Sequence, residues 1–66
     1  MFLGYARHEQ MKSDLIDALA RVADPNDEFT QRQVARSIGC SLEEFSNSEL
    51  AEMGDAIARK WSMYHS

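Results

Sequence analysis

The stretch QRQVARSIGCSLEEF, residues 31–45, predicts two short helices separated by a tight turn. Val34, Ala35 and Ile38 recur at the spacing of one helical face. Gly39 follows them, and glycine commonly ends helices because it adopts the left-handed conformation without a steric clash at Cβ. We therefore expect one helix to end at Gly39 and another to begin directly after it.

Three helix-start signals surround the turn. A Ser or Thr followed three residues later by Glu or Gln can form a capping box, in which each side chain bonds the backbone N–H of the other residue. The three candidate pairs are Thr30 with Gln33, Ser41 with Glu44, and Ser46 with Glu49. Phe29 and Val34 are placed to close a hydrophobic staple over the first pair. We expect a helix to begin at each of the three positions.

Apolar periodicity predicts a longer helix on each side of this centre. The upstream stripe consists of Met11, Leu15, Leu19 and Val22, and the sequence Asp24-Pro25-Asn26-Asp27 breaks it. The predicted fold is all-α, a single domain over residues 1–66 with four helices at about residues 6–23, 31–38, 42–45 and 47–63. Residues 1–5 are apolar apart from Gly4 and could form a short strand, a frayed arm or a dimer contact.

The central stretch resembles the helix-turn-helix of the phage-repressor-like DNA-binding families over roughly residues 30–48. Ala35 matches the small residue of the first motif helix and Gly39 the turn glycine, while Val34, Ile38 and Phe45 match the apolar anchors. The resemblance implies a transcriptional regulator that binds double-stranded DNA as a dimer, on half-sites about 34 Å apart. It implies phosphate contacts from Gln31, Arg32, Gln33 and Arg36, and base contacts from Ser41, Ser46 and Asn47.

Acidic side chains favour a second hypothesis from a different class. The helix that the resemblance places in the major groove has no Lys or Arg, and Ser48 stands where a further apolar anchor is expected. The acidic residues of this region are Glu43, Glu44, Glu49 and Glu52. They could form a face that binds a basic partner. The chain would then be a protein-binding inhibitor or adaptor, for example a phage-type one, built on a helix-turn-helix scaffold.

Length and composition favour a homodimer. The chain has 66 residues, one Cys and a formal net charge of −4. A domain of this size buries only about 60% of the surface of its unfolded chain, and a lone Cys forms no internal disulfide. The apolar stripe of the last helix is therefore a candidate dimer seam, formed by Leu50, Met53, Ile57, Trp61 and Tyr64. Gly54 weakens that helix by roughly 1 kcal/mol relative to Ala, which a close helix crossing would explain.

We predict no enzymatic activity, cofactor or metal. Cys40 has no sequence-near His to activate it, and His8 and His65 lack the spacing of metal ligands. The chain also lacks a Gly-rich phosphate loop, an apolar run long enough to cross a membrane, and a secretory signal. A lone Cys suits a reducing compartment, so we expect a cytoplasmic protein without membrane contact.

Overall fold

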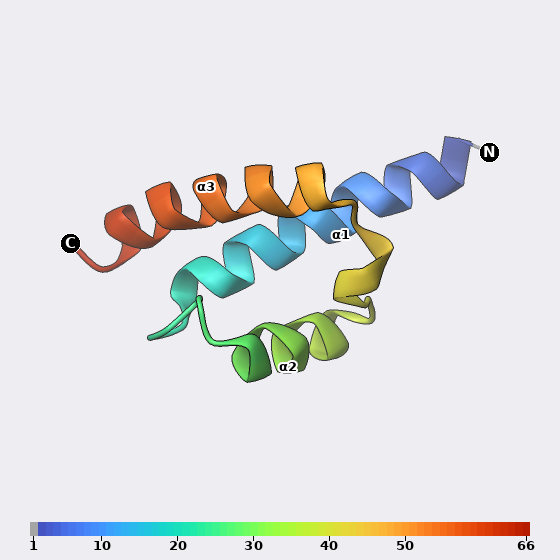
Figure 1. Ribbon diagram of the computed structural model, residues 1–66. Helices are drawn as coiled ribbons and strands as arrows, with labels where there is room; N and C mark the ends of the chain where they lie inside the picture. The colour runs from blue at the N-terminus through green and yellow to red at the C-terminus, as the bar shows by residue number, and fades with distance from the viewer. Residues whose placement is uncertain (1) are drawn as a thin grey trace.

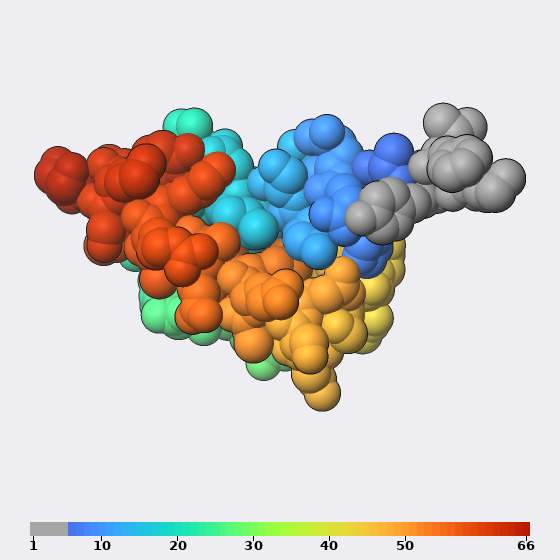
Figure 2. Space-filling model, turned by 90° about the horizontal axis from the view of Figure 1, so that it is seen from above, coloured from blue at the N-terminus to red at the C-terminus, as the bar shows by residue number. Residues whose placement is uncertain are grey.

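The computed structural model describes the backbone of residues 2–66 and the side chains of residues 6–66. This part of the chain is all-α. Its elements are α1 (Phe2–Arg21), α2 (Glu28–Ile38), the short 3-10 helix η1 (Leu42–Glu44) and α3 (Asn47–Tyr64). α1 packs against both α3 and α2, and η1 joins α2 to α3 (Figure 1). Seen from above, α3 lies beside α1 and α2 lies beneath them (Figure 2). No helix in the described residues is both long and apolar enough to cross a bilayer.

The start of α2 differs from the prediction, because its N-cap is Asp27 and not Thr30. The Asp27 carboxylate accepts bonds from the Thr30 backbone N–H at 2.9 Å and from the Thr30 hydroxyl at 2.8 Å. The Thr30 hydroxyl is a donor here, so the predicted capping box with Gln33 is wrong. Phe29 consequently lies inside the helix with 70% of its surface exposed, and the predicted staple with Val34 is also wrong.

The turn after α2 confirms the role predicted for Gly39. This residue has a φ of 94° and is the C-cap of α2, and its N–H donates to the carbonyl oxygens of Ala35 and Arg36. Any residue with a Cβ atom is strained at this φ. The chain therefore reverses at the predicted place.

Both downstream capping boxes form as predicted, at Ser41 with Glu44 and at Ser46 with Glu49. The first box starts only a 3-10 helix of three residues, because Phe45 ends it and Ser46 already caps α3. The predicted helix at about residues 42–45 is thus a single turn. The described chain has three α-helices and one 3-10 helix in place of four helices.

α1 begins earlier and ends earlier than predicted. The backbone is helical from Phe2, so the alternative of a short strand is wrong for residues 2–5. Met1 and the side chains of residues 1–5 lie outside the described part, and the alternatives that depend on them stay predictions. The helix ends at Arg21, just after which the Val22 N–H bonds the Leu19 carbonyl oxygen at 3.4 Å.

The core lies where the three α-helices and η1 converge. Its buried side chains are Leu15, Leu19, Ala35, Phe45 and Met53. Leu15 is the largest side chain with no exposed surface. Ile16 packs against this cluster, so it widens the apolar face of α1. A core of this size leaves little stability in reserve, as expected for a small domain.

Candidate functional site: an open cleft between α2 and α3

A cleft of about 620 Å³ separates α3 from the segment formed by α2 and η1. In the described chain no Cα atom of α2 lies within 8 Å of a Cα atom of α3, although both helices pack on α1. Leu19 of α1 contributes to the lining, as does the loop between α1 and α2. Apolar side chains from both walls face the space, chiefly Leu42, Leu50, Ile57 and Trp61.

The α3 wall combines small and bulky residues. Gly54 and Ala58 lie four residues apart, so they occupy the same face of the helix one turn apart. Both line the cleft, where Leu50, Ile57 and Trp61 flank them and are half-buried. The wall is therefore a smooth strip along the helix axis with apolar side chains beside it.

One long-range bond and one local bond hold side chains that line the cleft. The Trp61 indole N–H donates to the Val22 carbonyl oxygen at 2.8 Å, which fixes the ring against the end of α1. Across the cleft, the Gln31 amide donates to the Pro25 carbonyl oxygen at 2.8 Å, which ties the loop to α2. Among the described residues that line the cleft, Asp24 of this loop is the one with a charged side chain.

The five predicted dimer-seam residues all make contacts within one chain. Met53 is buried in the core, and Leu50 and Ile57 pack against it. Trp61 bonds the end of α1, and the Tyr64 hydroxyl donates to Asp17. Met53, Trp61 and Tyr64 therefore hold α3 on the core and on the α1 side, while Leu50 and Ile57 also face the cleft, and the homodimer remains a prediction.

Two of the four predicted phosphate-binding residues bond to other parts of the chain, and the other two are exposed. Gln31 is bound to the loop, and Arg32 forms ion pairs with Glu28 at 3.1 Å and with Glu43 at 2.9 Å. The pKa of Arg32 is raised, mainly by its bond to Glu43. Gln33 and Arg36 are exposed on the outer side of α2.

The predicted base-contacting residues stand at helix starts. Ser41 caps η1 and Ser46 caps α3, so both hydroxyls accept backbone N–H bonds. Asn47 is exposed at the first residue of α3. Glu43 lies in η1, two residues after its N-cap Ser41, and its carboxylate accepts a bond from the Ser41 hydroxyl. This bond and the Arg32 ion pair lower the pKa of Glu43 to about 2.

The four glutamates of the predicted acidic face do not point in one direction. Glu43 pairs with Arg32 of α2, and Glu44 accepts a bond from the Ser41 N–H. Glu49 faces α1, whereas Glu52 is exposed on α3. Glu43, Glu44 and Glu49 thus make bonds at helix starts or between helices. Glu52 contributes surface charge.

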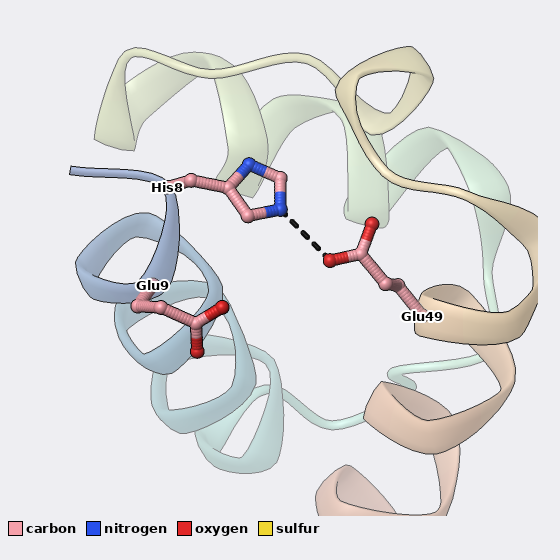
Figure 3. Close-up of side chains that lie close together, drawn as sticks. All are labelled: His8, Glu9 and Glu49. Carbon is pink, nitrogen blue, oxygen red and sulfur yellow. Dashed lines mark hydrogen bonds and ion pairs between the residues drawn. The ribbon is translucent and has the colours of Figure 1, made fainter. Parts of the chain in front are cut away.

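A second cluster joins His8 and Glu9 of α1 to Glu49 of α3, with potential metal ligand atoms within 4.8 Å of one another (Figure 3). His8 Nε2 lies 2.8 Å from Glu49 Oε2. The Lys12 ammonium lies 3.4 Å from Glu9 and 3.3 Å from Glu49, so a cation already neutralises both carboxylates. A divalent ion would meet the like charge of Lys12. The cluster therefore fits an ion-pair network that joins α1 to α3 better than a metal site.

Glu49 is central to that network. Its pKa falls to about 2, first because the Ser46 backbone N–H donates to it and then because His8 and Lys12 contribute further bonds. Sequence reasoning identified its capping role but missed its partners, since His8 lies 41 residues away. Only the packing of α1 on α3 brings these residues together.

Cys40 is half-buried and packs against the core. Burial raises the pKa of its thiol, with a further contribution from Glu44. The thiol form is therefore favoured over the nucleophilic thiolate.

The chain matches no protein-family model, no curated protein and no solved structure.

Proposed function

We propose that this chain is a protein-binding module, which acts as an adaptor or inhibitor by holding a segment of a larger protein in the cleft between α2 and α3. The observation that supports this most directly is the cleft itself, which is open to solvent and lined by Leu42, Leu50, Ile57 and Trp61. Covering such side chains removes apolar surface from water, which is the main favourable contribution to most protein–protein association.

The bonding of the polar residues also favours protein binding over DNA binding. Gln31 and Arg32 are engaged inside the chain, and Glu43 and Glu44 stand in η1, where the resemblance places the DNA-reading helix. Carboxylates there repel phosphate. A helix of three residues also offers little length to reach into a major groove. DNA binding through Gln33 and Arg36 remains the second hypothesis, with less support.

A random peptide library displayed on phage tests the proposal, because it requires no identified partner. We expect wild-type protein to enrich peptides that no longer bind Ala58→Trp, because the added indole occupies the cleft. Ser48→Trp is the matched control, since Ser48 is exposed on the same helix and does not line the cleft. Enriched peptides should bind this control as tightly as they bind wild type.

Two results would contradict the proposal. One is the absence of any enriched peptide. The other is a set of enriched peptides that bind Ala58→Trp and wild type equally, which would place the binding surface elsewhere.

A further inference from the structure

We propose that the occupant of the cleft is an amphipathic α-helix of another protein, which crosses α3 closely at Gly54 and carries Lys or Arg beside its apolar face. This inference rests on the proposed function and specifies the partner's chemistry. Three features support it, namely an unexplained glycine, the shape of the cleft and its charge.

Gly54 is not required by the backbone or by the packing of the described chain. A Cβ atom built on it meets nothing within 4 Å, and its φ lies outside the left-handed region. Glycine inside a helix is less stable than Ala by about 0.5–1 kcal/mol, so the fold alone would favour Ala. Gly54 and Ala58 together form a small-xxx-small strip, a pattern that allows a second helix backbone to approach closely.

The shape of the cleft suits a helix. Its α3 wall extends from Leu50 to Ser62, about 18 Å at the rise of an α-helix. An extended peptide gains affinity by pairing with a strand edge, and the described chain has no strand. A compact polar ligand would need convergent hydrogen-bonding groups, yet the Gln31 amide and the Trp61 N–H already bond backbone carbonyls. A helix satisfies its own backbone and needs only apolar contacts.

The charge of the cleft indicates a basic partner. Asp24 lines the cleft, and no Lys or Arg is among the described residues of the lining. Beside the lining on α3, the exposed Asp55 follows Gly54 and the exposed Arg59 follows Ala58. A second copy of this chain is disfavoured as the occupant, because each copy has a net charge of −4 and two copies repel one another. Lys and Arg beside the apolar face of a foreign helix would instead complement Asp24 and Asp55.

Three synthetic peptides of about 15 residues, close to four helical turns, test the inference. The first has a Leu face flanked by Lys, the second has the same Leu face flanked by Glu, and the third is the first with its residues scrambled. Binding is followed by the emission of Trp61, the single tryptophan of the chain, which lines the cleft. We expect the Lys peptide to bind at least about tenfold more tightly than the Glu peptide, and the scrambled peptide not to bind.

Single substitutions in the protein show where the Lys peptide binds. Gly54→Leu should weaken the Lys peptide by at least about tenfold, because its side chain occupies the crossing point. Ser48→Leu adds the same side chain outside the cleft and should leave the affinity unchanged. Asp24→Asn and Asp55→Asn should each weaken binding by about threefold and reduce its salt dependence.

Equal affinity for the Lys and Glu peptides would overturn the inference, as would unchanged binding to Gly54→Leu. If the peptide library yields cleft-dependent binders that are acidic or rich in proline, the proposed function stands and the inference fails. If the library yields none, both fail. A dimer in solution that Gly54→Leu dissociates would also overturn the inference, by assigning the cleft to a second copy.

Discussion

Trp61 and Val22 join the C-terminal half of α3 to the end of α1 through a 2.8 Å hydrogen bond from the indole N–H to the backbone carbonyl oxygen. The bond spans 39 residues of sequence and lies at one end of the cleft. It holds a large aromatic ring in the wall of the cleft. The stability of the fold and the shape of the candidate site therefore depend on the same contact.

Trp61→Phe should lower the free energy of unfolding by about 1 kcal/mol, because it removes this bond and leaves the Val22 carbonyl oxygen without its partner. Urea denaturation followed by far-UV circular dichroism measures the change. Tyr64→Phe is the comparison, since it removes the bond to Asp17 on the exposed surface and should have a smaller effect. An equal loss of unfolding free energy in both variants would mean that the Trp61 bond contributes no more to stability than the exposed bond of Tyr64.

Gly54→Ala and Gly39→Ala should change stability in opposite directions. Ala at position 54 should stabilise the fold by about 1 kcal/mol, because the position is helical and its surroundings are open. Ala at position 39 should destabilise it by about 1–2 kcal/mol, because φ there is +94°. Thermal unfolding of the two variants and of wild type shows whether each substitution raises or lowers the stability of the fold. A destabilised Gly54→Ala would reveal a packing role for this glycine within the chain.

Glu49 makes the fold sensitive to acid. Its pKa is about 2 in the folded chain, against an ordinary value of about 4.3 in the unfolded chain. The folded chain thus binds this proton more weakly, so Glu49 stabilises the fold above the ordinary pKa and the contribution is lost as pH falls through about 2. We expect Glu49→Gln to lose less stability than wild type between about pH 5 and pH 2.

Urea denaturation at a series of pH values measures that difference, with Glu52→Gln as the control. Glu52 is exposed on α3 and makes no ion pair with the side chains that the structure describes. Its variant should follow the wild-type curve. Identical acid limbs for wild type and Glu49→Gln would remove Glu49 from the network that joins α1 to α3.

Leu15→Ala should destabilise the fold by about 3 kcal/mol or more, because Leu15 has no exposed surface and truncating a buried Leu leaves a cavity that its surroundings fill only in part. The single core of a domain below about 70–80 residues rarely supplies more than about 3–5 kcal/mol, so this variant should keep little or no net stability at room temperature. Circular dichroism and a denaturation curve report the loss. Ile16→Ala, at a half-buried position beside it, should cost less.

Duplex DNA provides a direct test of the second hypothesis. Because the net charge is −4 and Arg32 is paired with two glutamates, we expect no micromolar affinity for random duplex DNA at physiological salt. Fluorescence anisotropy with labelled DNA at low and physiological salt measures this. Micromolar binding that weakens with salt, with a slope reduced by about one unit in Arg36→Ala, would instead support DNA binding through α2.

The helical class and most of the helix ends could be predicted from the sequence, because they depend on local chemistry. The caps at Ser41 and Ser46 and the turn at Gly39 use groups within a few residues of one another. The start of α2 could not be predicted in this way, because Asp27 and Thr30 are both good caps. In the structure the Asp27 carboxylate accepts the bond from the Thr30 N–H. Local pattern alone does not decide between two such neighbours.

The candidate site could not be predicted, because it depends on how the helices cross. Apolar periodicity identified the stripe from Leu50 to Tyr64, but the same stripe suits a partner chain or α1 equally well. The loop of Asp24 and the side chain of Leu42 meet α3 across the cleft only through the tertiary fold. Gly54 was the one local hint of a close helix approach.

Chemical-shift mapping by NMR tests the central claim most directly. The tightest peptide from the library is added to the protein while the backbone amide signals and the Trp61 indole signal are followed. We predict that the largest shifts fall on Leu42, Gly54 and Trp61, on both walls of the cleft. Shifts confined to Phe29, Gln33 and Arg36 on the exposed side of α2 would contradict the claim and place binding on the surface that the DNA hypothesis uses.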